Sequence, residues 1–397
     1  MCLECYQNYS EFQWCKPCNS KHFQNDFNNW TSRNDKIDKL IQDTQLNANN
    51  YWNEVIEWIP YDRFKDVKQI GKGGFGTIHY ARYPKDIIVA LKKFNNFVNF
   101  NDVLNEMEIH FRTNNIHGTI KFYGITQDPE THSFMMVLEY AAGGNLREYL
   151  KNNFDNFNWE QKLENLYRLS FDLMHIHKLD IVHQDFHPGN ILLSNFKNDI
   201  KISDFGLSKL MWENPNNAEK KNIFGVLPYI APEVLSGDEE YTKAADVYSF
   251  GIITYEIVTG IPPYPDMPHD KDLAMKICNG LRPRIPFHTP KLITRMIMRC
   301  WDARVTHRPT FEELYYDLIQ IENSEEFSAN QESTNTTTTT PLNYKTHPQA
   351  IYTSRLLDFS KLPKPKNEEN FERELEELTK STSALSIVAS KLHVPDF

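Results

Sequence analysis

The pattern of apolar and polar positions changes character part-way along the chain. From Phe64 to Tyr80 the two kinds of residue alternate around several glycines, which predicts a β-hairpin. The apolar, β-branched run from Ile87 to Phe94 predicts a further strand, and the segment from Asn101 to Thr113 predicts a helix. From Leu146 onward helical spacing dominates. A strand-rich part followed by a helix-rich part predicts an α+β fold with two lobes.

The clearest helical face of the second lobe carries apolar residues at helical intervals, namely Leu163, Leu166, Leu169, Leu173 and Ile176. Before the hairpin, Ile37, Leu40 and Ile41 also lie at helical spacing, and we expect this lead-in to pack on the first lobe. The chain therefore divides into a cysteine-containing segment (1–22), a helical lead-in (23–63), the two-lobed domain (64–322) and a tail (323–397).

The tail is rich in Ser, Thr, Asn, Gln and Glu, and it includes the threonine run Thr336–Thr340. Such a segment buries too little apolar area to offset the entropy lost on ordering, so we expect a mostly disordered tail. Near its end, Phe371, Leu375 and Leu378 predict a short, solvated helix.

Charge and composition narrow the class of protein. The 397 residues include 43 Lys and Arg against 53 Asp and Glu, a formal net charge of −10, which argues against nucleic acid as a partner. No apolar run approaches the roughly 20 residues that span a bilayer, and the N-terminus lacks the apolar region of a signal peptide. We therefore expect an intracellular, cytoplasmic protein without a membrane span.

The cysteines are unevenly distributed. Cys278 and Cys300 lie in predicted helical core, whereas the other four form two pairs, Cys2-x-x-Cys5 and Cys15-x-x-Cys18, with nine residues between them. Two such knuckles let four thiolates converge on a structural Zn²⁺, in a small module that would recruit a protein partner. Free thiols in a disordered terminus are the alternative, and His22 is a conceivable substitute ligand.

The strongest chemical signal is a pair of motifs. Residues 183–190 read His-Gln-Asp-Phe-His-Pro-Gly-Asn, and residues 203–206 read Ser-Asp-Phe-Gly. Mg²⁺ on a phosphoryl donor prefers oxygen ligands, and an attacking hydroxyl needs an oriented proton acceptor. Asp185, Asn190 and Asp204 can supply these groups.

A glycine-rich turn precedes them in the predicted hairpin, with the sequence Gly71-Lys72-Gly73-Gly74-Phe75-Gly76. Glycines let the backbone approach phosphate oxygens without a Cβ in the way. Between two strands, this pattern favours a lid over phosphates rather than a dinucleotide-binding turn. Farther on, Val89-Ala90-Leu91-Lys92 resembles a strand whose lysine contacts the phosphates of the donor, and Glu106 on the following helix is the candidate counter-charge of Lys92.

Further motifs follow in a fixed order: Ala231-Pro232-Glu233, Asp246-Val247-Tyr248-Ser249-Phe250-Gly251, Cys300-Trp301 and Arg308-Pro309. With these motifs, residues 64–322 resemble a eukaryotic protein kinase of the tyrosine-kinase-like group. The segments 227–230, 279–283 and 350–354 further resemble a lineage-expanded set of fungal kinases. Small-molecule kinases acting on choline or aminoglycosides share the Asp-to-Asn offset but lack the Ala-Pro-Glu segment and the helix after it.

The resemblance implies a protein substrate, ATP and Mg²⁺, and it implies a role for each matching residue. Asp185, Lys92, Glu106 and Asn190 would be catalytic, with Asn190 and Asp204 holding Mg²⁺. The residues implied in ATP binding are Ile70, Gly71, Gly73, Gly74, Phe75, Gly76, Ile78, Ala90, Lys92, Glu139, Ala141 and Leu192, with Leu138 behind the adenine.

The resemblance also assigns scaffold roles. Glu233 and Arg308 would form a buried ion pair, Asp246 would bind the backbone of the catalytic loop, and His183 would brace that loop. The acceptor hydroxyl stays open, because His187 and Val226 stand where serine/threonine kinases usually carry Lys and Thr. We favour a serine/threonine kinase, with a tyrosine or dual-specificity kinase and a nucleotide-binding pseudokinase scaffold as alternatives.

One departure concerns regulation. Gln184 replaces the Arg that normally pairs with a phosphorylated activation loop, and the sequence between Lys209 and Pro228 contains no Ser, Thr or Tyr. A buried Arg without a phosphate partner would be an uncompensated charge, so a neutral Gln suits a loop that is not phosphorylated there. We expect control by something other than phosphorylation of this loop.

Overall fold

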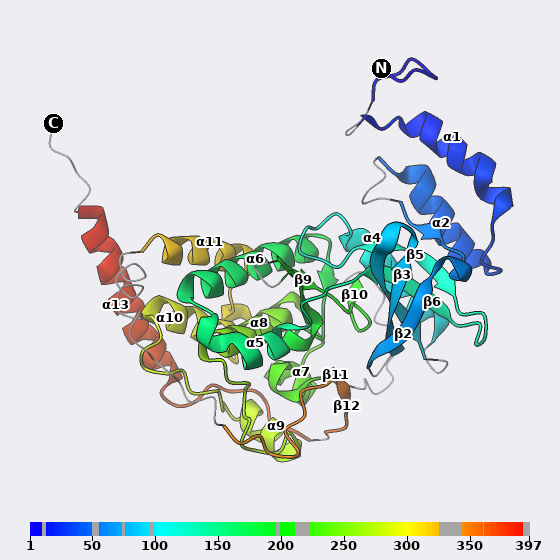
Figure 1. The fold of residues 1–397 in the computed structure, drawn as a ribbon. Coiled ribbons are helices and arrows are strands. Elements are labelled where there is room, and N and C mark those ends of the chain that lie inside the picture. Colours follow the sequence, from blue (N-terminus) through cyan, green and yellow to red (C-terminus); the bar gives the residue numbers. More distant parts are fainter. Residues whose placement is uncertain are drawn as a thin grey trace, which may run out of the picture. The chain divides into compact units, whose positions relative to one another are not determined.

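A computed structural model describes residues 1–9, 13–49, 55–73, 76–95, 99–195, 199–210, 223–324, 344–359 and 361–391. The chain forms two units (Figure 1). The first contains Met1–Ala142 together with Ser203–Ser208, and the second contains Gly143–Ile202 together with Lys209–Phe397. The predicted division into a strand-rich and a helix-rich part is confirmed at this level.

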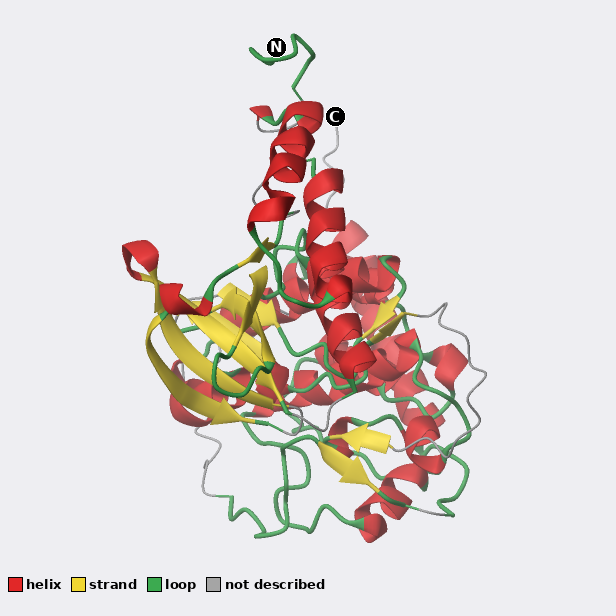
Figure 2. Ribbon diagram, turned by 90° about the vertical axis from the view of Figure 1, so that its right-hand side faces the viewer, coloured by secondary structure: helices red, strands yellow, loops and turns green. Residues whose placement is uncertain are grey.

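The first unit is built on a six-stranded sheet in the order β1-β5-β6-β4-β3-β2, whose strands are yellow in Figure 2. The strands are β1 (Glu57–Trp58), β2 (Lys65–Lys72), β3 (Gly76–Tyr83), β4 (Ile87–Phe94), β5 (Phe122–Gln127) and β6 (Phe134–Glu139). Its helices are α1 (Lys16–Asp26), α2 (Asp35–Asn47) and α4 (Phe100–Thr113). The predicted hairpin, strand and helix therefore match β2–β3, β4 and α4.

One face of this sheet covers a core that includes Phe64, Val89, Leu91 and Val137. Because side chains alternate along a strand, Ala90 and Lys92 lie on the opposite face of β4. The sequence pattern thus determines which face of β4 carries the chemistry.

The lead-in packs within the first unit, as predicted. Asn34 caps α2 by accepting hydrogen bonds from the backbone N–H groups of Lys36 and Ile37, and the Ile37 and Ile41 side chains are fully buried. Gln45 donates to the carbonyl oxygen of Ile56 at 3.1 Å, and β1 then pairs in parallel with β5. The lead-in therefore supplies an edge strand of the sheet as well as a helix.

The second unit is mostly helical, and its core is crossed by α8, which is buried along almost its whole length. Its α-helices are α5 (Leu146–Asn153), α6 (Trp159–Lys178), α7 (Pro232–Ser236), α8 (Lys243–Thr259), α9 (Lys271–Cys278), α10 (Lys291–Cys300), α11 (Phe311–Glu322) and α13 (Phe371–Lys391). The apolar face predicted from Leu163 to Ile176 lies on α6, and all five of its residues are buried. Helix α6 packs against α11 and α8.

Three two-stranded sheets complete the second unit. Their strands are β7 (Ile181–Val182) with β10 (Lys209–Leu210), β8 (Ile191–Asn195) with β9 (Asp199–Ile202), and β11 (Ile223–Gly225) with β12 (Arg355–Leu357). Strands β7 and β8 flank the His-Gln-Asp-Phe-His-Pro-Gly-Asn motif at residues 183–190.

The expectation of a mostly disordered tail is wrong for residues 344–359 and 361–370, whereas the helix predicted around Phe371, Leu375 and Leu378 is present as α13. Strand β12 pairs with β11, and α13 lies beside α10 in Figure 1. Leu357, Phe371 and Thr382 are buried, and Arg295 donates to the Thr382 hydroxyl at 3.0 Å. These buried residues are few within a segment of polar average composition. The prediction of disorder was based on that average composition and therefore missed them. The threonine run lies outside the described residues.

Candidate active site

In the first unit, a lysine and two carboxylates form a buried cluster. Strand β4 places Lys92 opposite Ile78 of β3 and Met136 of β6, and its ammonium group forms an ion pair with Glu106 of α4. The same Nζ lies 2.7 Å from Oδ1 of Asp204. The sequence predicted the pairing of Lys92 with Glu106, and the structure brings them together across 14 positions of the chain.

The cluster shifts the pKa values of its members. Burial by itself would lower the pKa of Lys92, but the nearby Asp204 and Glu106 carboxylates outweigh it and raise that pKa above its usual value. Burial raises the pKa of Glu106 to about 7, because the lowering effect of Lys92 is partly cancelled by the negative charge of Asp204. Lys92 is therefore a permanent cation.

The segment Ser203–Ser208 is held in this unit by α4. Phe205 is fully buried and its ring lies edge-on to His110, with 5.0 Å between the ring centroids. Asn105 donates to the carbonyl oxygen of Ser208 at 3.1 Å. A Cβ on Gly206 would lie 3.0 Å from a carboxylate oxygen of Glu106, so glycine keeps this approach close. This packing delivers Asp204 to Lys92.

Three residues implied in ATP binding, Ile78, Ala90 and Leu138, share one face of the sheet. Ala90 pairs with Tyr80 on one side and with Leu138 on the other. Two residues farther along β4, Lys92 pairs with Ile78. Residues two apart on a strand point the same way, so Ile78, Ala90 and Leu138 lie on the face that carries Lys92. Of the other implied residues in this unit, Ile70 is exposed and Glu139 and Ala141 are half-buried, and their role remains a prediction.

The structure describes both ends of the glycine-rich turn, at residues 71–73 and at Gly76. The backbone N–H of Gly73 donates to the carbonyl oxygen of Gly76 at 2.9 Å, which closes the hairpin. At Gly76 a Cβ would lie only 2.2 Å from the carbonyl oxygen of Lys93 on the neighbouring strand, so any side chain there would displace β4. Gly71 has no such constraint, and Gly74 and Phe75 lie outside the described residues.

In the second unit, Asp246 of α8 holds the backbone of the loop at residues 183–190, as the resemblance implied. Oδ2 of Asp246 accepts the backbone N–H of His183 at 2.8 Å, and Oδ1 accepts that of Gln184 at 3.1 Å. His177 also contacts Oδ2, at 2.9 Å. The His183 side chain is fully buried and lies beside Phe186, in agreement with a structural role.

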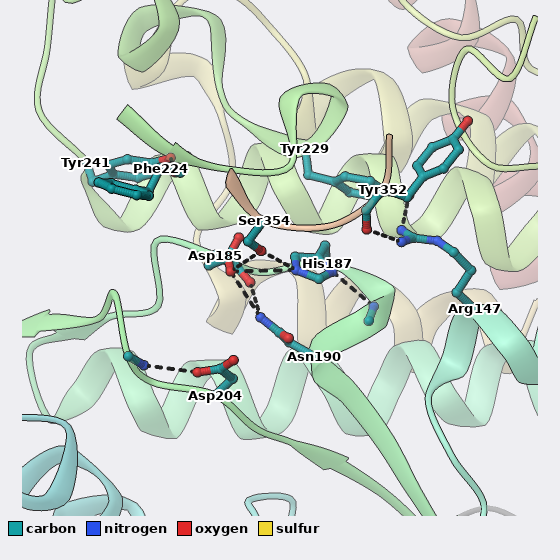
Figure 3. A network of polar contacts seen from close by, with 12 residues as sticks. Arg147, Asp185, His187, Asn190, Asp204, Phe224, Tyr229, Tyr241, Tyr352 and Ser354 are labelled. Carbon is teal, nitrogen blue, oxygen red and sulfur yellow. Dashed lines mark hydrogen bonds and ion pairs between the residues drawn. The ribbon is translucent and has the colours of Figure 1, made fainter. Parts of the chain in front are cut away.

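The loop presents the Asp185 carboxylate among hydrogen-bonding side chains (Figure 3). Asn190 Nδ2 donates to the backbone oxygen of Asp185 at 2.9 Å and lies 3.3 Å from its Oδ2. The hydroxyl of Ser354, from the tail, donates to the same Oδ2 at 2.6 Å. His187 Nε2 lies 3.1 Å from that hydroxyl oxygen.

Comparison with known proteins places this geometry in a family. The model of the family described as "Protein tyrosine and serine/threonine kinase" matches residues 64–318. The chain belongs to this kinase family.

Individual relatives of this kinase differ in their named specificity. R831 of Acanthamoeba polyphaga mimivirus, whose name describes a serine/threonine-protein kinase/receptor, is 32% identical over 289 residues, which cover 72% of this chain and 17% of the viral protein. Tyrosine-protein kinase SPK-1 of Girardia tigrina is 31% identical, covering 62% of this chain and 50% of its own. Dual specificity protein kinase pyk3 of Dictyostelium discoideum is 28% identical, covering 73% and 21%. The match thus spans less than a fifth of the viral relative.

The scaffold ion pair of the kinase domain is present as predicted. Both carboxylate oxygens of Glu233 accept from the guanidinium of Arg308, each at 2.7 Å, and both side chains are buried. Arg308 also donates to the carbonyl oxygens of Asp302 and Ala244, which satisfies more of its donors.

Sequence reasoning missed a second polar network, formed by Arg147, Tyr229, Glu256 and Tyr352. Arg147 donates to the Tyr229 hydroxyl and to the Tyr352 carbonyl oxygen, both at 2.8 Å, and pairs with Glu256 at 3.3 Å. The Tyr229 hydroxyl also donates to Glu256. This network ties the tail to α5 and α8. Only the isolated apolar and aromatic residues near Ile351 in a polar tail could have indicated it.

The two N-terminal cysteine pairs converge in the first unit. The Sγ atoms of Cys2, Cys5, Cys15 and Cys18 all lie within 4.8 Å of one another, with Cys2 and Cys18 3.7 Å apart and Cys5 and Cys15 3.4 Å apart. His22 instead contacts Glu4, at 2.9 Å. The backbone N–H groups of Cys5 and Glu4 lower the pKa of the Cys2 thiol to about 7.

Within the described part of the chain, the structure contains no helix with the length and apolar character that crossing a bilayer requires.

Proposed function

We propose that this chain is an ATP- and Mg²⁺-dependent protein kinase that transfers the γ-phosphate of ATP to a protein serine or threonine hydroxyl. The observation that carries the proposal is the ion-paired cluster of Lys92 with Glu106 and Asp204. Burying a lysine costs free energy unless its charge is paired, as it is here, and a cation held in this way can bind phosphate oxygens.

Each residue has a distinct task in this proposal. Lys92 binds phosphate oxygens and is held in place by Glu106, while Asp185 accepts the proton of the acceptor hydroxyl. Asn190 and Asp204 would hold Mg²⁺, and the ion would neutralise charge on the phosphoryl group that ATP donates. Each residue carries an oxygen of the kind that Mg²⁺ prefers; the Asp204 side chain is 40% exposed, and Asn190 uses its amide nitrogen to bind the backbone oxygen of Asp185.

The proposal also includes the acceptor and the kinase group. We propose that the acceptor is serine or threonine and that the chain belongs to the tyrosine-kinase-like group. The relatives carry serine/threonine, tyrosine and dual-specificity names, so they leave the acceptor open. A serine hydroxyl hydrogen-bonded to Asp185 supports the serine/threonine assignment. It also supports an active loop over a pseudokinase scaffold.

The test is phosphate incorporation from radiolabelled ATP into a protein substrate such as casein, with analysis of the phosphoamino acids. Asp185→Asn should reduce incorporation about 10²- to 10⁴-fold. Asp180→Asn, which removes a half-exposed carboxylate paired with Lys243, is the matched control and should keep the activity. Equal incorporation by wild type and Asp185→Asn would contradict the assignment, and label on tyrosine alone would exclude the serine/threonine part.

We also propose that the kinase is not switched by phosphorylation of its activation loop. Gln184 uses its backbone N–H to bind Asp246, and the nearest hydroxyl before the loop, that of Ser208, belongs to a residue that is only 1% exposed. Phosphopeptide mapping of active enzyme should find no phosphate between Asp204 and Pro228. Activation that depends on phosphorylated Ser208 would contradict this proposal.

A structural Zn²⁺ is the proposed role of the four N-terminal cysteines. Four thiolates bound at about 2.3 Å would lie roughly 3.8 Å apart, close to the separations of 3.4 and 3.7 Å seen here. The module is fastened to α2, whose last carbonyl oxygens accept hydrogen bonds from Trp14, Lys16 and Ser20. We propose that it, or the tail, recruits a protein partner inside the cell.

Metal analysis of the purified chain should find one zinc per molecule. Cys5→Ser together with Cys18→Ser should lose the metal, whereas Cys278→Ala, which removes a thiol of α9, should retain it. A chain without zinc, or equal zinc in both variants, would leave the cysteines as free thiols.

A further inference from the structure

The tail segment that follows Tyr344 lies along the catalytic loop of its own chain. Strand β12 pairs antiparallel with β11, in the register Gly225 with Arg355 and Ile223 with Leu357. A Cβ on Gly225 would lie 3.3 Å from Oδ1 of Asp185, so the end of β11 is in contact with the catalytic carboxylate. The register therefore fixes which tail residue meets Asp185, and that residue is Ser354.

The hydroxyl of Ser354 is oriented for reaction (Figure 3). The backbone N–H of Gly189 donates to Nδ1 of His187 at 3.0 Å, so in the neutral ring the proton is on Nε2. That Nε2–H then donates to the Ser354 oxygen, at 3.1 Å, and the Ser354 O–H donates to Asp185, at 2.6 Å. The serine proton points at the proposed base, and one lone pair of its oxygen is left for a bond.

Several anchors hold this segment, so the contact with Asp185 is not made by one side chain alone. The carbonyl oxygen of Ile351 faces Nδ1 of His269 at 2.9 Å, and the Tyr352 hydroxyl donates to the carbonyl oxygen of Pro263 at 2.9 Å. The guanidinium of Arg147 stacks over the Tyr352 ring at 4.9 Å. Peptides are commonly bound as an added strand with side-chain pockets on either side, and the tail reproduces that mode.

We propose that Ser354 is a phosphorylation site of the kinase, modified in cis by its own active site. This inference rests on the proposed function. Oγ of Ser354 forms a bond to the γ-phosphorus of ATP while the bond from that phosphorus to the β,γ-bridging oxygen breaks. ADP leaves with the electron pair, and the hydroxyl proton passes to Asp185.

The product cannot keep the contacts of the serine. A phosphate group carries a charge of about −1.5 to −2 at neutral pH and would face the Asp185 carboxylate that the hydroxyl contacted before. The phosphate is repelled by the carboxylate and is larger than the hydroxyl, so the tail segment leaves the loop. Another substrate can then bind beside Asp185. The activation segment carries no hydroxyl between Lys209 and Pro228, whereas the strand paired with it follows three hydroxyl residues, Tyr352, Thr353 and Ser354.

The test uses the full chain, first treated with a phosphatase, then incubated with Mg²⁺ and ATP and mapped by tandem mass spectrometry. Phosphate should appear on Ser354 with a rate constant that does not change with protein concentration. In a mixture with wild type, a tagged Asp185→Asn chain should stay unmodified at Ser354. Thr353→Ala is the matched control, because Thr353 is exposed, and it should keep the phosphate that Ser354→Ala loses.

A readout without nucleotide tests the docking itself. Hydrogen exchange should show protection of the Arg355–Leu357 amides in the wild type. Ser354→Glu places a negative charge against Asp185 and should speed exchange in this strand at least tenfold, whereas Thr353→Glu should not.

Casein phosphorylation in the same samples separates the two possible failures. If the wild type labels casein while Ser354 stays unphosphorylated, cis phosphorylation of Ser354 is wrong and the proposed kinase function stands. If neither is labelled, both are wrong. Equal exchange in the two glutamate variants, or modification of the tagged Asp185→Asn chain, would also overturn the cis proposal.

Discussion

Two buried lysines, one in each unit, have opposite pKa shifts at nearly equal exposure. Lys92 is 5% exposed and Lys162, on α6, is 7% exposed. The pKa of Lys92 is raised, but burial lowers the pKa of Lys162 to about 8. Lys92 faces two carboxylates, whereas Lys162 donates to the carbonyl oxygen of Val258 at 3.1 Å and lies over the Phe154 ring at 4.1 Å. Carboxylates, and not burial, make a lysine a permanent cation.

The largest expected contrast is in catalysis. Lys92→Met removes the cation proposed to bind phosphate and should reduce phosphate transfer about 10²- to 10³-fold. Lys162→Met changes a lysine remote from the proposed chemistry and should keep activity within about threefold of wild type. Initial rates with radiolabelled ATP measure both. Equal losses in the two variants would mean that Lys92 acts only through the fold.

Stability should change in opposite directions. Lys92→Met leaves the Glu106 and Asp204 carboxylates without their cation and should lower the free energy of unfolding by about 3–5 kcal/mol. Lys162→Met removes a buried charge whose depressed pKa corresponds to at most about 3 kcal/mol, and it should stabilise the chain by up to that amount. Urea unfolding measures both, and Glu106→Leu added to Lys92→Met should recover part of the loss. Destabilisation by Lys162→Met would contradict the comparison.

The pH dependence of the first cluster follows from Glu106. Its folded pKa of about 7 lies above its usual value of 4.5, so the folded chain gains a proton before the unfolded chain does. Relative to Glu106→Gln, the wild type should therefore gain stability as the pH falls from about 7 to 4.5. Its activity should fall over the same range, since the proton removes a partner of Lys92. Activity that is flat down to pH 5 would contradict this expectation.

The smallest effect concerns Lys162 at alkaline pH. Its folded pKa of about 8 lies below its usual value of 10.5, so the unfolded chain binds more protons between these two values. The wild type should therefore gain stability relative to Lys162→Met as the pH rises from 8 to 10.5. The stabilising effect of Lys162→Met should shrink over this range. Thermal unfolding of both proteins at several pH values measures the difference, and a constant difference would contradict the assigned pKa.

Much of the Lys92 cluster could be predicted from the sequence, because local patterns determine it. Alternation along β4 gives the face that carries Lys92, and helical spacing on α4 presents Glu106 to it. The contact from Asp185 to Ser354 could not be found in this way, because it spans 169 positions and depends on the register of a three-residue strand. Average composition also hid the buried Leu357 and Phe371 in a polar tail.

The pairing of β12 with β11 has a consequence for competition between substrates. Two groups on one chain meet at an effective concentration that can reach the millimolar range. A free peptide at micromolar concentration would then need about a thousandfold higher intrinsic affinity to occupy the loop equally. In the proposed cis reaction, the docked tail would therefore restrict the choice of substrate, because only tightly binding peptides would be modified before Ser354 leaves the loop.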